Sequence, residues 1–146
     1  MDNSDSKKEG VGKTYMRADG YAPIFSYIGT EGYMLDCELR SGSQYCQKGT
    51  PEFLKSNLRI LETLELSEPV LFRLDGGNDG IKTILPLIGK NRFFLIKRNL
   101  RKKSREAWLE CAQVLGTKRI ARPGKVVCTG IITKAHPKKA PSMRSF

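Results

Sequence analysis

The chain has 146 residues, 39% of them hydrophobic, which is enough for one domain with an apolar core. No apolar stretch approaches the roughly 18 residues that cross a bilayer, and the charged first residues lack a secretory-signal pattern, so we expect a cytoplasmic protein with no membrane partner. The formal net charge of +11 is uneven: residues 1–89 carry 10 Lys and Arg against 13 Asp and Glu, whereas residues 90–146 carry 16 against 2.

Two strands are expected early in the chain, at residues 21–28 and 33–39, joined by a glycine-containing turn into an antiparallel hairpin. In the second strand Leu35, Cys37 and Leu39 alternate with acidic residues, which is the period of a half-buried strand. This alternation predicts that the apolar set faces the core.

An amphipathic helix is predicted over residues 51–66. Thr50 is of the residue type that favours the N-cap, and Pro51 suits the first helical position. Leucines then recur at helical spacing, at Leu54, Leu58, Leu61 and Leu64. This leucine stripe should be the buried face of the helix.

A buried strand with a core on both faces is predicted over Val70–Leu74, and it ends in Asp75. The glycine-rich turn Gly76–Gly80 follows and leads into a short helix near Ile81–Ile88. In α/β enzymes this order places an acid at the carboxyl edge of a sheet, where it can hold a metal ion. The alternative is that Asp75 only caps the next helix.

The last elements complete the expected order. A buried strand at Phe93–Ile96 is followed by a helix that Ser104 caps and that Gly116 ends. A further strand is predicted at Val126–Ile132, and the segment after it is rich in Lys, Pro and Ser. The helix is expected to turn four apolar residues inward: Trp108, Leu109, Ala112 and Leu115.

The cysteines are Cys37, Cys46, Cys111 and Cys128, all widely spaced, and the single histidine, His136, is far from most of them. This spacing is not that of a zinc cluster. We expect reduced thiols, most of them buried.

Several short stretches follow one another in a characteristic order: Asp2–Ser4, Lys7–Val11, Asp19–Phe25, Gly29–Tyr33, Glu38–Arg40, Gly49–Leu54, Arg73–Asp79 and Ile96–Arg101. In order and spacing they resemble the DDE-domain transposases of bacterial insertion sequences, over about residues 2–130. The order of predicted elements is also that of an RNase H-like core, with a preceding strand needed to complete the sheet. We therefore expect an α/β fold that is a partial RNase H-like core, a mixed sheet with flanking helices, and the start of a β-rich insertion near the C-terminus.

The resemblance implies a cut-and-paste DNA transposase, in which two Asp and one Glu hold two divalent metal ions, expected to be Mg²⁺. One ion activates water or a DNA hydroxyl, while the other stabilises the leaving oxygen of the phosphodiester. Asp75 matches the second Asp of the family motif, so the resemblance makes it a catalytic metal ligand.

The match is incomplete at both ends. In the family the first Asp lies on a strand before the part that resembles Asp2–Ser4, and the Glu lies on a later helix beyond a β-rich insertion. Glu110 falls on a predicted helix, but it does not match the family's glutamate motif. The expectation is a truncated transposase fragment, inactive alone, that forms a homodimer or pairs with a full-length transposase. The alternative is a non-catalytic, basic DNA-binding remnant.

The expected organisation is a polar N-terminal segment at residues 1–20, the partial RNase H-like core at 21–116, the start of a β insertion at 117–133 and a disordered basic tail at 134–146. The net charge of +14 over residues 90–146 indicates a polyanion partner, most simply DNA, although a solvated basic segment is the alternative. The candidate phosphate contacts follow the Phe93–Ile96 strand, on the sheet edge where Asp75 is expected. They are Lys97, Arg98, Arg101, Lys102, Lys103 and Arg105.

Overall fold

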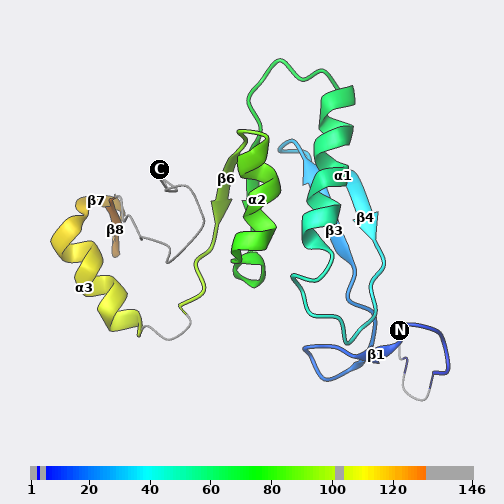
Figure 1. Cartoon of the computed structure of the whole chain (residues 1–146). Coiled ribbons are helices and arrows are strands. Elements are labelled where there is room, and N and C mark those ends of the chain that lie inside the picture. Colours follow the sequence, from blue (N-terminus) through cyan, green and yellow to red (C-terminus); the bar gives the residue numbers. More distant parts are fainter. Residues whose placement is uncertain (1–2, 4–5, 101–103, 131–146) are drawn as a thin grey trace. The chain divides into compact units, whose positions relative to one another are not determined.

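The computed structural model describes residue 3 and residues 6–100 and 104–130. Within these residues the fold is mixed α/β, with three α-helices and small two-stranded sheets (Figure 1). The chain divides into two compact units, Met1–Asn99 and Leu100–Phe146, and each is described by itself. The predicted tail at residues 134–146 lies outside the described residues.

The first unit opens with a short antiparallel pair that the sequence did not predict, β1 (Gly12–Lys13) and β2 (Asp19–Gly20). The predicted hairpin follows as β3 (Ile24–Ile28) and β4 (Tyr33–Glu38), which pair antiparallel. Because β4 carries one extra residue, Leu35, the pairing shifts between Ser26 and Tyr27.

The predicted orientation of β4 is wrong. Cys37 is exposed and Leu39 is 69% exposed, whereas Asp36 and Glu38 are half-buried. A one-residue bulge moves every following side chain to the opposite face, which explains the reversal. The acids that turn inward have partners: Asn57 donates from Nδ2 to Asp36 Oδ2 at 3.3 Å, and Arg40 donates from Nε to Glu38 Oε1 at 2.8 Å.

Helix α1 (Thr50–Thr63) confirms the predicted amphipathic helix and buries Leu54, Leu58 and Leu61. The prediction is wrong for Leu64, which lies at the C-cap, beyond the last helical residue, and is 47% exposed. Its N-cap is Gly49 and not Thr50. Gly49 has a φ of 78°, a left-handed conformation that glycine adopts without steric cost because it has no Cβ. The Thr50 hydroxyl donates to the carbonyl of Cys46 at 2.8 Å, so it fastens the loop before the helix.

The strand that ends before Asp75 is β5 (Leu71–Leu74), and it pairs in parallel with β6 (Phe93–Ile96). Helix α2 (Ile81–Gly89) connects them, preceded by the 3-10 turn η1 (Gly76–Asn78). The expectation of a core on both faces of this sheet is wrong.

One face of the β5–β6 sheet closes the apolar core, and the other face is open. Phe72, Leu74 and Phe94 pack against the buried cluster of Leu54, Leu58 and Leu87. On the opposite face the side chains are largely exposed: Leu71 by 53%, Phe93 by 64% and Leu95 by 59%. Within the described residues of the first unit, the sheet therefore has a helical layer on one side only.

The second unit consists of helix α3 (Arg105–Leu115) and a hairpin of β7 (Thr117–Arg122) and β8 (Lys125–Thr129). Ser104 caps α3 as predicted, since its Oγ accepts from the Ala107 amide at 3.2 Å. The predicted inner face of α3 is partly wrong. Trp108, Cys111 and Ala112 are half-buried, whereas Leu109 and Leu115 are 49% and 64% exposed.

The cysteines are free, as expected, but they are not mostly buried. Cys37 and Cys46 are exposed, and Cys111 and Cys128 are intermediate. The reversed face of β4 accounts for Cys37, and Cys46 lies in the loop before α1. No helix in the described part of the chain has the length and apolarity needed to cross a membrane.

The apolar core predicts an uneven response to substitution along α2. Leu87 is fully buried, so Leu87→Ala should lower the free energy of unfolding by about 2–5 kcal/mol. Leu85 on the same helix is 49% exposed, and Leu85→Ala should change it by about 0.5 kcal/mol or less. Urea unfolding of both variants measures the difference, and equal losses would contradict this packing.

Candidate functional site

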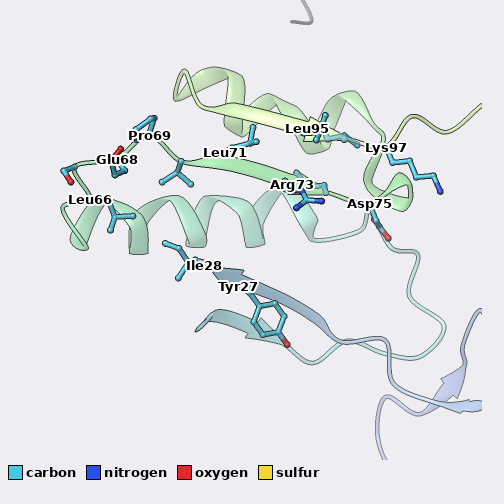
Figure 2. A pocket seen from close by; sticks show the side chains of 15 residues that line it. Tyr27, Ile28, Leu66, Glu68, Pro69, Leu71, Arg73, Asp75, Leu95 and Lys97 are labelled. Carbon is cyan, nitrogen blue, oxygen red and sulfur yellow. The ribbon is translucent and has the colours of Figure 1, made fainter. Parts of the chain in front are cut away.

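The carboxyl ends of β5 and β6 lie at the same edge of the parallel pair. Leu74 pairs with Ile96, and the Lys97 amide continues the ladder by donating to the Leu74 carbonyl at 3.3 Å. Figure 2 shows Asp75 and Lys97 following the two strands at this end. The structure therefore brings together two of the residues that the sequence analysis assigned to function.

Asp75 is exposed and begins the η1 turn, but its side chain makes no capping hydrogen bond to the backbone. Its Oδ1 instead accepts from Asn78 Nδ2 at 2.7 Å. A Cβ at Gly77 would stand 3.3 Å from Asp75 Oδ1 and 3.4 Å from Cys46 Sγ, so both atoms approach this glycine closely. The turn is narrow, and glycine leaves room for the carboxylate beside it.

Asp79 holds the segment that follows β6. Its Oδ1 accepts from Arg98 Nη1 at 2.8 Å, and its Oδ2 accepts from the Asn99 amide at 3.0 Å. The Asp79 side chain is 13% exposed and the Arg98 side chain 49% exposed. We call this arrangement of Asp79, Arg98 and Asn99 the Asp79 clamp.

Sequence reasoning missed the Asp79 clamp. The available signal was an acid, Asp79, four residues after Asp75, together with a basic residue, Arg98, just beyond the next strand. The parallel pairing places the carboxyl ends of β5 and β6 side by side, so a residue after one strand can contact a residue after the other.

The loop before α1 fixes the other side of the η1 turn. Cys46 Sγ and Gln47 Nε2 both donate to the Gly77 carbonyl, at 3.1 and 2.9 Å. These contacts join residues about 30 positions apart in the chain, so no local pattern in the sequence indicates them.

A buried arginine orients this loop in turn. Arg40 is 5% exposed, and its Nη1 donates to the Cys46 carbonyl at 3.3 Å and to Thr50 Oγ1 at 3.2 Å. Its guanidinium carbon lies 5.8 Å from the centre of the Phe53 ring, within the range of a cation–π contact. The salt bridge to Glu38 offsets the charge of this buried arginine.

The predicted phosphate-binding residues are distributed over both units. Lys97 and Arg98 are exposed and adjacent after β6, and Arg105 is exposed in the first turn of α3 in the second unit. Beside Arg105, the pKa of Glu106 is lowered, first because its carboxylate accepts a hydrogen bond from its own amide and then because Ser104 donates to it. Three further predicted residues, Arg101, Lys102 and Lys103, lie outside the described residues.

The residues at this edge do not fit a two-metal centre. Within residues 3, 6–100 and 104–130, no three His, Cys, Asp or Glu side chains group so that they could hold a metal ion. The Asp75 carboxylate accepts a hydrogen bond from Asn78, and the Asp79 carboxylate accepts hydrogen bonds from Arg98 and Asn99 in the clamp. Glu110 lies on α3 in the second unit and is exposed.

Comparisons with protein-family models, with curated proteins and with solved structures found no match for this chain. Function therefore has to be inferred from the residues of the chain and their geometry.

The Asp79 clamp predicts a local effect of removing one charge. Asp79→Asn keeps the size of the side chain but weakens both hydrogen bonds, so the Asn99 amide should exchange with solvent faster. Because the ion pair is partly exposed, the free energy of unfolding should fall by only about 0.2–1 kcal/mol.

Asp75→Asn is the matched control, since the Asp75 carboxylate bonds to Asn78 and not to Asn99. Amide exchange followed by nuclear magnetic resonance compares the two variants. Unchanged exchange at Asn99 in Asp79→Asn would show that the clamp does not hold this segment.

Proposed function

We propose that the chain is a DNA-binding part of a DDE-type insertion-sequence transposase that does not cleave DNA on its own. The observation that carries this proposal is the division of charge, a net −3 over residues 1–89 against +14 over residues 90–146. Neutralising phosphates and releasing their counterions is the simplest use of such a basic segment.

The resemblance of the ordered stretches supports the family assignment, and so does the order of elements. The first unit runs β3, β4, α1, β5, α2, β6, with Asp75 directly after β5. This order is compatible with part of an RNase H-like core, in which Asp75 would correspond to the second Asp of the family.

Phosphate contacts are proposed at two places. Lys97 and Arg98 are exposed next to each other in the first unit, and Arg105 is exposed in the second. The Asp79 clamp offsets part of the charge on Arg98, so Lys97 should contribute more to DNA binding than Arg98. Contacts to phosphate position DNA without reading bases, so the binding should be insensitive to sequence.

Strand cleavage through two metal ions requires several carboxylates that together offset the ionic charge. Asp75 is one carboxylate, and within the described residues no three His, Cys, Asp or Glu side chains group so that they could hold a metal ion. We therefore assign DNA binding and not metal-dependent strand transfer to this chain alone. The catalytic reaction would need a complementing polypeptide, such as a full-length transposase.

Salt dependence tests the phosphate contacts. Lys97→Gln should reduce the slope of log association constant against log salt by about 0.9, the value for one phosphate contact on duplex DNA. Lys55→Gln makes the same charge change on the exposed side of α1 and should leave the slope nearly unchanged. Fluorescence anisotropy with a short labelled duplex measures both slopes, and equal slopes for the two variants would contradict the placement of DNA at this edge.

A cleavage assay tests the second part of the proposal. Supercoiled plasmid incubated with the chain and Mg²⁺ should stay uncut, because Asp75 alone cannot hold two ions. Nicking that disappears in Asp75→Asn would refute this expectation and would restore a catalytic role for Asp75.

A further inference from the structure

The short hairpin at the start of the first unit ends in an exposed tip. Residues 14–17 join β1, drawn in blue in Figure 1, to β2, and the Arg17 amide donates to the Thr14 carbonyl at 2.9 Å across the turn. At this tip Tyr15 is 93% exposed and Met16 is 69% exposed. Two adjacent large side chains therefore have little contact with the rest of the chain.

Arg17 stands at a position that favours glycine. Its φ is 62°, in the left-handed region, and hairpin loops of three residues usually place glycine at this point. Arg17 is exposed and forms no ion pair with any described residue, so its described contacts do not explain why an arginine is there. A residue held in a strained conformation without a structural return indicates a contact outside the chain.

The tip is firmly held from below. The amide and the hydroxyl of Thr14 both donate to the Ala18 carbonyl, at 3.0 and 2.9 Å. At the base of the hairpin Gly42 lies so close to the carbonyls of Gly12 and Gly20 that no Cβ would fit there. A tip that is already ordered loses little conformational freedom when it binds a partner.

The hairpin is basic in an otherwise acidic part of the chain. Residues 7–17 carry four basic residues against one acid, whereas residues 18–89 carry six against ten. This local positive charge favours an anionic partner. The four basic residues are Lys7, Lys8, Lys13 and Arg17.

We infer that the hairpin tip inserts Tyr15 into the base stack of DNA, with Met16 against the neighbouring base and Arg17 on a phosphate. Every base has an aromatic face on which a tyrosine ring can stack, and inserted apolar side chains kink a duplex. Phosphates alone would not engage an uncharged ring, whereas DNA offers bases to Tyr15 and phosphates to Arg17. The inference rests on the proposed DNA binding and adds to it a contact with bases at a second place in the first unit.

A missing base tests the insertion, because it opens the stack without the cost of separating two stacked bases. The probes are two labelled duplexes of the same sequence, one intact and one with a single central abasic site. By fluorescence anisotropy the whole chain should bind the abasic duplex about tenfold more tightly than the intact one, since only the intact duplex has to be unstacked.

Substitutions of tyrosine identify the inserted ring. Tyr15→Ala should remove the preference and weaken binding to the abasic duplex by about five- to hundredfold, the loss of one stacked base. Tyr15→Phe should keep the preference, because stacking needs the ring and not the hydroxyl. Tyr33→Ala is the matched control, since Tyr33 is 69% exposed on β4, outside the basic stretch, and should leave the preference unchanged.

Arg17→Gly separates binding from stability. Glycine adopts the φ of this position without steric cost, so the melting temperature of the variant should not fall. The slope of log association constant against log salt should decrease by about 0.9, the value for one phosphate contact. An unchanged slope would contradict the contact of Arg17 with a phosphate.

Two results would overturn the inference and leave the proposed DNA binding intact. They are equal affinity of the chain for the two duplexes and a preference for the abasic duplex that survives Tyr15→Ala. Binding to neither duplex would instead refute the proposed function, and the inference with it.

Discussion

Leu54 and Leu58 of α1 pack with Leu87 of α2 in a small apolar cluster, and side chains of β5 and β6 close it from the other side. Burying a leucine contributes about 1.5–3 kcal/mol, so these few residues supply much of the stability of the first unit. They also set the position of the two parallel strands. Because β5 and β6 are held in register, Asp75 and Lys97 emerge at a common edge.

Four carboxylates of the first unit accept hydrogen bonds from other residues of the chain. Asp75 accepts from Asn78, Asp79 from Arg98, Asp36 from Asn57 and Glu38 from Arg40. Charge-assisted hydrogen bonds of this kind fix turns and loops more firmly than neutral ones. Of these acids, Asp79 holds the segment after β6, which carries the exposed Lys97 and Arg98.

Local patterns predicted the helices and the strands Phe93–Ile96 and Leu71–Leu74 because helical leucine spacing and apolar runs are short-range signals. The orientation of β4 could not be predicted, since the extra residue at Leu35 is defined only by its pairing with β3. The exposure of one face of β5 could not be predicted either, because it depends on which elements pack against the strand. At the site, Asp75 and Lys97 were found from strand ends, whereas the contacts of Cys46 and Gln47 to Gly77 span long stretches of chain and leave no local pattern.

The position of α1 in the chain has a consequence for the order of folding. The partners of its leucine stripe all lie C-terminal to it, within residues 71–96, so this core cannot close until the chain has been made up to this segment. The hairpin β3–β4 precedes α1 and leaves the ribosome first, with Phe25 and Tyr27 about half exposed or more even in the finished fold. During synthesis the hairpin therefore exposes these aromatic side chains to water until α1 has been made and can pack against it.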